Sequence, residues 1–471
     1  MGIRLDWEIE ADQRSIKGSG EDPNRKRARR GALLRLLILV GILLGAVAVV
    51  GYLIYDRLNE VDAEIERILR DTVEAEVAAL RISDRNAFLR YQWEGSETWL
   101  NAQQAAFADY EQRLRENPNF ELTGNILDVT IDDPRARVEV QEIENGVPYT
   151  RLWFYYRFEQ DTDEDGFADV WQWYRVPQDT TFWGAPATLE TEHVLLRYNE
   201  FDQPLAEPLA QQLDGWITTA CEIIDCAGLP QIIVDIETEE LNSRIQWSDS
   251  AIWRLEVLSP YIDRMRTDMP FSPALRSAAA TLVAERLTMY AAGFPTVAPN
   301  TAADYFINTA IPSWMVGRFL QANTGAELVE SLVQNYGPDA LSRLLRTLQT
   351  DPRISALRQV TGVPLDQVNL DWRDFFQWRL EREVALIAAQ NTNAVLELYD
   401  TRDQVVTDAM YARLNQPQPV ESIQVTSVTP TTPSPTGEAQ FNVNVRVGQA
   451  DAASELVITF RLVDGVWRRA S

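Results

Sequence analysis

The hydrophobic pattern of the chain begins with an uninterrupted run of 20 uncharged residues, Leu36–Tyr55. A helix of this length crosses a hydrocarbon layer of about 30 Å, because each residue adds about 1.5 Å. The basic segment RKRARR (25–30) precedes the run, and a mostly acidic segment follows it. Since positively charged flanks stay in the cytoplasm, this pattern predicts a cytoplasmic N-terminus and an extracytoplasmic remainder.

We therefore expect a single-pass anchor in the plasma membrane, with the membrane as a partner through Leu36–Tyr55. The expected segments are a cytoplasmic basic tail at 1–30, a transmembrane helix at 31–55 and an extracytoplasmic part at 56–471. A cleaved signal peptide and a buried core helix are the alternatives. Against a signal peptide, the charged lead and the apolar run are both long, and no clear small-residue cleavage site follows them.

Beyond the membrane segment, apolar residues recur at every third or fourth position from Leu58 to Leu80, which predicts an amphipathic helix. This helix is either the first helix of a domain or a parallel dimerising stalk, for which about three heptads are barely enough. From Asn125 to Pro177 the period changes to two, which predicts strands with a hairpin turn at Asn145-Gly146.

The second half of the chain returns to the helical period. Two strands with a helix between them are expected before residue 240, and residues 272–390 are expected to be almost entirely helical. Ser272 and Pro273 form a helix cap followed by proline at the first helical position. After a Pro/Thr-rich stretch, the chain ends in strands, the last two joined at Asp464-Gly465. The order of elements predicts an α+β multidomain protein.

Composition narrows the classes of function. An apolar content of 45% and 14 Trp indicate globular domains. A net charge of -27 argues against nucleic acid as a partner, because a phosphate backbone needs a basic surface. The chain has one histidine, His193, which opens a predicted strand and is expected to be structural. A zinc site with two histidines on one helix is therefore impossible in this sequence.

The two cysteines are candidates for a disulfide. Cys221 and Cys226 are five residues apart, and on a continuous helix their Cα atoms would be roughly 8–9 Å apart. A disulfide needs Cα atoms closer than about 7 Å, so the bond requires the helix to end between the cysteines. Gly228 and Pro230 mark a helix end nearby, and the expected extracytoplasmic location permits disulfides. The sequence leaves the bonded and free forms equally open.

The acidic stretch DTDEDGFAD has the spacing of the first half of a calcium loop. Carboxylates alternate before a glycine at the sixth position, and the ninth position adds another oxygen ligand. The twelfth position is Gln172, where an EF-hand has glutamate, and the flanking elements are predicted strands rather than helices. Calcium is thus a possible cofactor, and a solvated hairpin tip is the alternative. The candidate ligands are Asp161, Asp163, Asp165 and Asp169.

Three stretches together resemble the gluzincin, or peptidase MA-like, superfamily. LETEHVLLRY (189–198) resembles the opening strand of its membrane-anchored bacterial members. LVAERLTMYAAG (282–293) is similar to the helix that carries the HExxH motif, and IPSWMVGRFLQANTG (311–325) is similar to the helix that supplies the third zinc ligand. The resemblance covers roughly Leu189–Leu386. It implies a mostly helical domain with a small N-terminal sheet.

The resemblance also implies that this domain lacks its zinc chemistry. Ala284-Glu285-Arg286-Leu287-Thr288 stands where HExxH is expected, and Gly317 stands where the glutamate ligand is expected. Ala and Gly have no ligand atom in their side chains, and a neutral Thr hydroxyl is a poor zinc ligand. Glu285 matches the general base, but without a metal-bound water it has little to activate. We expect no catalytic residue, no zinc site and no cofactor other than possible calcium.

The flanking parts resemble a second fold. Residues from about Asp56 to Trp183, and the C-terminal strands ending LVDGVWRRAS, are similar to the nuclear-transport-factor-2-like cone, in which helices pack on a curved sheet. The expected domains are a cone-like α+β domain at 56–185, an inactive peptidase-like domain at 186–388 and a C-terminal α+β domain at 389–471. Such cones host many unrelated functions, so the fold alone implies none.

The favoured function is binding or scaffolding in the cell envelope, with an unidentified protein or envelope polymer as partner. The former substrate groove is the expected interface. One alternative is a hydrolase without zinc that acts on an envelope polymer through carboxylate pairs, although no spacing in the sequence identifies a pair. Another alternative is a calcium-stabilised structural stalk.

Overall fold

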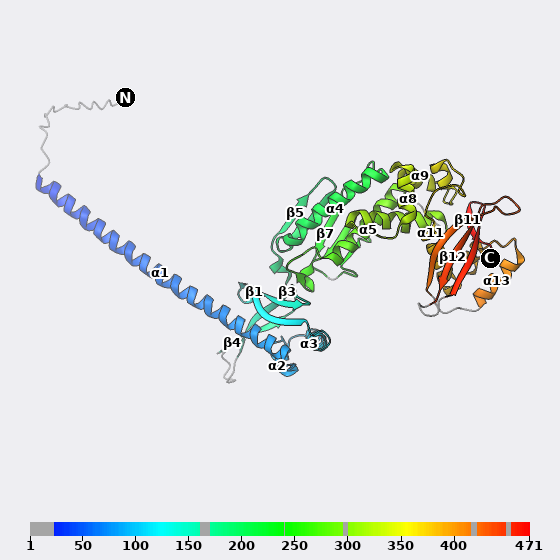
Figure 1. Ribbon diagram of the computed structural model, residues 1–471. Coiled ribbons are helices and arrows are strands. Elements are labelled where there is room, and N and C mark those ends of the chain that lie inside the picture. Colours follow the sequence, from blue (N-terminus) through cyan, green and yellow to red (C-terminus); the bar gives the residue numbers. More distant parts are fainter. Residues whose placement is uncertain (1–22, 161–169, 240, 295–299, 416–421, 449–453) are drawn as a thin grey trace, which may run out of the picture. The chain divides into compact units, whose positions relative to one another are not determined.

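The computed structural model describes residues 23–160, 170–239, 241–294, 300–415, 422–448 and 454–471. Contacts between Cα atoms divide the chain into two compact units. The first unit comprises Met1–Gln112, Val129–Ala136 and Tyr155–Val176, and the rest of the chain forms the second. Helices and strands both occur throughout, so the predicted α+β class is confirmed (Figure 1).

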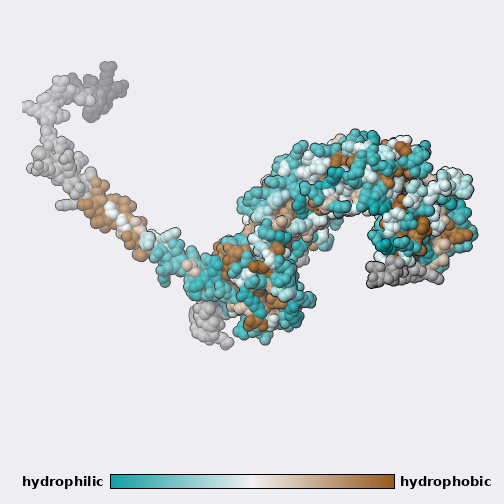
Figure 2. Space-filling view, viewed as in Figure 1, coloured by the Kyte–Doolittle hydropathy of each residue, from teal (hydrophilic) through white to brown (hydrophobic). Residues whose placement is uncertain are grey.

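The first unit begins with one long helix, α1 (Pro23–Arg81). Figure 2 shows the hydrophobic stretch of this helix in brown, and its large apolar side chains from Leu37 to Tyr55 are exposed. Among the described residues, α1 is the one helix that is long and apolar enough to cross a membrane. The predicted apolar run is thus a helix, and it continues without a break into the amphipathic segment.

The amphipathic segment of α1 divides into two parts. Leu58 and Val61 are exposed, whereas Leu69, Val73 and Val77 are at most 2% exposed. The buried part packs on the short helix α2 (Arg85–Leu89), in which Phe88 meets a phenylalanine of α3 (Glu97–Glu116). The C-terminal half of the predicted stripe is therefore the first helix of a packed unit.

A buried polar cluster joins α1 to the strands of the first unit. Glu76 is fully buried and accepts hydrogen bonds from the Tyr155 hydroxyl (2.8 Å), Gln92 Nε2 (3.1 Å) and Arg175 Nη1 (2.6 Å). Burial and the charge of Glu76 raise the pKa of Tyr155 well above its usual range. Buried charges are tolerated when they are paired and hydrogen-bonded, as they are here.

The strands predicted between residues 125 and 177 form an antiparallel sheet that the middle of the chain completes. Its order is β1-β2-β3-β10, and β4 also pairs with β3. The predicted hairpin is confirmed, because Asn145 and Gly146 both have positive φ between β2 and β3. Sequence reasoning did not predict β10. The strands are β1 (Phe120–Asp132), β2 (Arg135–Glu144), β3 (Val147–Gln160), β4 (Val170–Val176) and β10 (Met265–Arg266).

The second unit contains a second sheet, with the strand order β5-β6-β7-β9-β8. Strands β6, β7 and β9 are parallel, and the two edge strands are antiparallel to them. Helix α4 (Gln203–Ile224) connects β6 to β7 and packs on β6. The strands are β5 (Pro186–Glu190), β6 (Val194–Asn199), β7 (Ile232–Glu237), β8 (Ile245–Trp247) and β9 (Arg254–Leu258).

Helices then follow one another, as the sequence predicts for residues 272–390. The Ser272 hydroxyl accepts a hydrogen bond from the Leu275 amide, which confirms the cap at the start of α5. The helices are α5 (Pro273–Ala291), α6 (Ala302–Tyr305), the π-helical turn η4 (Phe306–Ala310), α7 (Ile311–Leu320), α8 (Glu327–Tyr336), α9 (Asp339–Leu348), α10 (Ala356–Thr361) and α11 (Arg373–Ala388). Short 3-10 turns are η1 (Thr180–Trp183), η2 (Glu200–Asp202) and η3 (Pro260–Ile262).

The C-terminal strands form a four-stranded antiparallel meander that packs on α11. Phe376 of α11 contacts the rings of Phe441, Phe460 and Trp467, so the core of the helical region continues into this sheet. Asp464 and Gly465 have positive φ and form the predicted turn between the last two strands. The elements are α12 (Thr392–Glu397), α13 (Gln404–Asn415), β11 (Ile423–Thr431), β12 (Gln440–Val447), β13 (Ser454–Val463) and β14 (Val466–Arg469).

Candidate functional site

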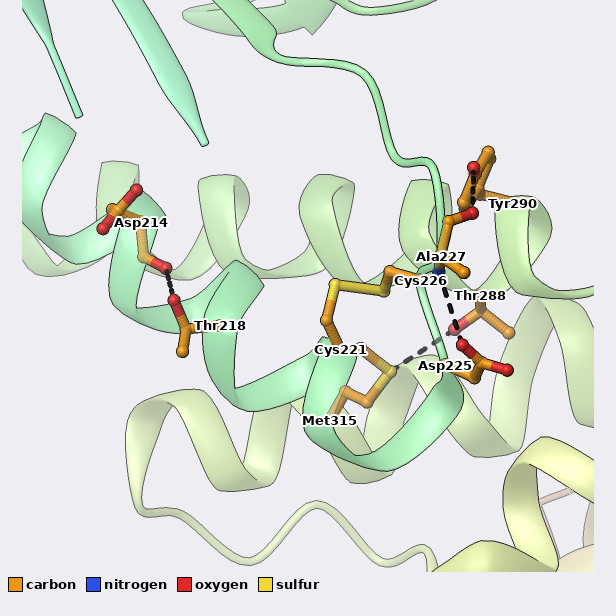
Figure 3. The surroundings of a disulfide bond; sticks show 9 residues. All are labelled: Asp214, Thr218, Cys221, Asp225, Cys226, Ala227, Thr288, Tyr290 and Met315. Carbon is orange, nitrogen blue, oxygen red and sulfur yellow. Dashed lines mark hydrogen bonds between the residues drawn. A yellow bond between two sulfur atoms is a disulfide. The ribbon is translucent and has the colours of Figure 1, made fainter. Parts of the chain in front are cut away.

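The two positions where the resemblance places histidine ligands lie on one buried face of α5. Ala284 and Thr288 are both 0% exposed, one helical turn apart. The Thr288 hydroxyl donates to the Ala284 carbonyl oxygen at 2.8 Å and lies 3.5 Å from Sδ of Met315 on α7 (Figure 3). This face of α5 is therefore filled by packing against α7, and the Thr288 hydroxyl is already used in a hydrogen bond within its own helix.

Glu285 and Arg286, between these two positions, are partly exposed. Partial burial raises the pKa of the Glu285 carboxyl, and the charge of Arg286 opposes this shift. The Arg286 guanidinium lies 4.5 Å from the centre of the Trp247 ring, at the edge strand β8. A raised pKa is typical of a general base, but also of any carboxylate that a helix partly covers.

Gly317, where the resemblance places the third ligand, faces a loop at the end of α7. A Cβ atom at this residue would be 2.9 Å from both the Ala322 carbonyl oxygen and Thr324 Oγ1. The Thr324 hydroxyl donates to the Ser313 carbonyl at 2.7 Å, which holds the loop against the helix. The close packing of this loop therefore accounts for glycine at position 317, because any larger residue would push the loop away.

A cavity of about 460 Å³ opens beside Gly317, and we call it the α7–α8 cavity. Glu330 is central in its lining, because it accepts a hydrogen bond from Trp314 Nε1 (2.6 Å) and pairs with Arg318 (3.4 Å). The Trp314 bond is the main cause that lowers the pKa of Glu330. Glu327 and Asp371 also line this cavity, which makes it polar and mainly acidic.

Cys221 and Cys226 are joined by a disulfide, with their Cα atoms 4.8 Å apart (Figure 3). Helix α4 ends at Ile224, between the two cysteines, and Asp225 follows with a positive φ. The Tyr290 hydroxyl of α5 donates to the Ala227 carbonyl at 3.0 Å. The end of α4 is thus held covalently to its own return segment and by hydrogen bonding to the end of α5.

The remaining candidates from the sequence are the calcium loop and His193. The calcium-loop residues Asp161, Asp163, Asp165 and Asp169 lie outside the described residues. Within the described ranges, no three His, Cys, Asp or Glu side chains are grouped as metal ligands would be. The backbone amide of His193 donates a hydrogen bond to Asp214 Oδ1 at 2.9 Å.

Sequence reasoning missed two groups of residues because neither forms a linear motif. One is the fully buried Asp202, which accepts a hydrogen bond from the Ser259 hydroxyl (2.6 Å). Burial raises the pKa of Asp202 to about 7. The other is a cavity lined with arginines, whose members are up to 153 residues apart, from Arg113 to Arg266. The strongly acidic total charge of the chain gives no signal for such a basic site.

No protein-family model, curated protein or solved structure matches this chain. The relation to zinc peptidases therefore stays an expectation that depends on the quoted residues.

Proposed function

We propose that this chain is a single-pass, plasma-membrane-anchored binding protein whose extracytoplasmic part uses a peptidase-like scaffold without metal chemistry. One observation supports this proposal above the others. The face of α5 that would carry two zinc ligands is closed by α7, with Ala284 and Thr288 fully buried. Neither the side chains nor the space on this face suits a catalytic metal and its water.

The proposed anchor is the apolar part of α1. Its exposed apolar side chains are favourable in a bilayer and unfavourable in water, where a patch of this size is rarely left uncovered. The basic residues before this stretch favour a cytoplasmic N-terminus. In this orientation all three described sheets and the described helices after α1 would face the extracytoplasmic side.

The proposed interface is the α7–α8 cavity. It lies beside Gly317, where a peptidase of the resembled superfamily would have its active-site cleft, and its lining combines polar side chains with Trp314. Glu327 and Asp371 supply negative charge there, and Arg318 supplies a positive charge. These side chains suit a polar partner with basic groups, either a protein segment or an envelope polymer.

Site-specific photo-crosslinking in intact cells tests this interface. A benzophenone amino acid replaces Gln334, an exposed residue of the α7–α8 cavity, and in a matched control it replaces Gln211, an exposed residue of α4. We expect a discrete adduct from position 334 that is absent from position 211 and weakened by Glu327→Lys, which replaces a negative charge of the lining with a positive one. Equal adducts from both positions, or none from position 334, would contradict the proposal.

A further inference from the structure

A second cavity of about 520 Å³, in the second unit, has a lining opposite in charge to the chain as a whole. Four arginines and one aspartate line it, although the chain carries a net charge of -27. We call it the arginine cavity. Its charged residues are Arg113, Arg244, Arg264, Arg266 and Asp263.

Two of these arginines, Arg244 and Arg266, keep hydrogen-bond donors beyond those used by their carboxylate partners. A guanidinium has five N–H groups. Arg244 uses Nη2 on Asp263 (2.6 Å), and Arg266 uses Nε and Nη2 on Asp268 (2.9 and 2.7 Å). Each therefore retains N–H groups that its ion pair does not occupy.

Arg264 is held more rigidly at the same cavity. Its guanidinium lies 4.3 Å from the centre of the Tyr149 ring, and Nη2 pairs with Glu144. Its Nη1 is buried without a hydrogen-bond partner, and the Glu142 carboxylate oxygen 3.9 Å away is beyond hydrogen-bond distance. A planar guanidinium fixed in this way is well suited to bind an oxyanion.

The N-terminus of α5 adds positive potential to the arginine cavity. Residues Ser272 to Leu275, the cap and first turn of this 19-residue helix, belong to the lining. The first turn has no acidic residue. The start of a helix carries a partial positive charge. Arg244, Arg264 and Arg266 already pair with carboxylates, so an added anion would meet their remaining N–H groups together with the partial charge of the helix start.

We propose that the arginine cavity binds an oxyanion with at least two negative charges, of the phosphate or polycarboxylate class. Such a ligand would accept hydrogen bonds from Arg244, Arg264 and Arg266 and meet the start of α5. The inference goes beyond the proposed function, because the two cavities share no lining residue. If no crosslinking is detected at the α7–α8 cavity, the inference about the arginine cavity is unaffected.

Isothermal titration calorimetry of the full chain in detergent micelles tests the inference, with inorganic pyrophosphate and citrate as separate probes. We expect saturable binding of one anion per chain that weakens as NaCl is raised, because the attraction is electrostatic. Tighter binding of pyrophosphate would identify the phosphate class, and tighter binding of citrate the polycarboxylate class.

Two sets of variants assign the binding to this cavity. Arg244→Gln with Arg266→Gln removes two exposed ion pairs and should weaken binding at least tenfold. Ala274→Asp places a carboxylate on an exposed position in the first turn of α5. It should abolish anion binding and raise the melting temperature, because the carboxylate would take the place of the anion. A merely structural arginine cluster would not produce that combination.

The matched control is Arg373→Gln. Arg373 forms a bidentate pair with Asp371, an aspartate two residues away, as Arg266 does with Asp268. Arg373 does not line the arginine cavity. This variant should leave pyrophosphate binding within twofold of the unmodified chain. The inference is overturned if neither anion binds saturably. It is also overturned if Arg373→Gln weakens binding as much as the cavity variants, because binding would then follow the overall charge.

Discussion

At the scale of single residues, the buried carboxylates carry the clearest energetic consequences. Glu76 is fully buried among Tyr155, Gln92 and Arg175. Removing one member of a buried ion pair costs about 3–5 kcal/mol, because the other charge remains in a medium that solvates it poorly. An exposed pair contributes at most about 1 kcal/mol.

Glu76→Ala should therefore lower the free energy of unfolding of the first unit by about 3–5 kcal/mol. Glu60→Ala, which breaks the exposed Arg57–Glu60 pair of the same helix, should lower it by less than about 1 kcal/mol. Urea unfolding followed by circular dichroism compares the two variants. Equal effects would show that the Glu76 cluster is not buried as described.

Asp202 predicts a pH dependence of stability. Its pKa is raised to about 7 in the folded chain by burial, from about 3.8 in the unfolded chain. Between about pH 4 and pH 7 the folded state therefore binds a proton on Asp202 that the unfolded state does not bind. The contribution of this proton to stability is full below about pH 4 and is lost as pH rises through about 7.

Asp202→Asn should remove this loss of stability at high pH, because an amide keeps an acceptor for the Ser259 hydroxyl and does not ionise. At pH 8 the variant should be more stable than the unmodified chain by roughly 2–4 kcal/mol, and the difference should shrink toward pH 4. Thermal unfolding between pH 4 and 8 measures it. A difference that is constant across this range would contradict the assigned pKa.

At the scale of elements, Gly317 and Gly215 make a matched pair of helical glycines. A Cβ at Gly317 would lie 2.9 Å from a backbone oxygen, whereas a Cβ at Gly215 of α4 would have no atom within 4 Å. Gly317→Ala should destabilise by about 1–3 kcal/mol through overpacking. Gly215→Ala should stabilise by about 0.5–1 kcal/mol, because alanine favours the helix. Calorimetry reports both, and a stabilising Gly317→Ala would show that the loop at Thr324 yields freely.

The elements also show which features a sequence reveals. The cap at Ser272 and the turns at Asn145-Gly146 and Asp464-Gly465 were predicted correctly, because each depends on a few neighbouring residues. Strand β10 was not predicted. Two residues are too short to show a period, and their pairing with β3 joins residues more than 100 positions apart in the chain.

In the candidate site, too, local residue types could be predicted from the sequence and contacts between distant residues could not. The absence of ligand side chains at Ala284, Thr288 and Gly317 could be read from residue types alone. The packing of Met315 against Thr288 and the close approach of the Thr324 loop to Gly317 depend on tertiary contacts. The arginine cavity depends on four separate segments, so neither spacing nor total charge could have revealed it.

At the scale of the whole molecule, the orientation of α1 in the membrane is testable. Right-side-out vesicles treated with proteinase K should lose residues 56–471, because this part is expected on the outer face. Inside-out vesicles should keep them and lose only the N-terminal tail. An antibody to a C-terminal tag reads both reactions, and protection of the tag in right-side-out vesicles would contradict the expected topology.

The proposed absence of zinc chemistry from a peptidase-like scaffold can be tested by measuring the metal content of the protein. The full chain in detergent micelles is incubated with a slight excess of zinc, dialysed against trace zinc and analysed by mass spectrometry. We expect far less than one zinc per chain, because the buried face at Ala284 and Thr288 offers no ligand set. One zinc per chain that survives dialysis and supports peptide hydrolysis would contradict it.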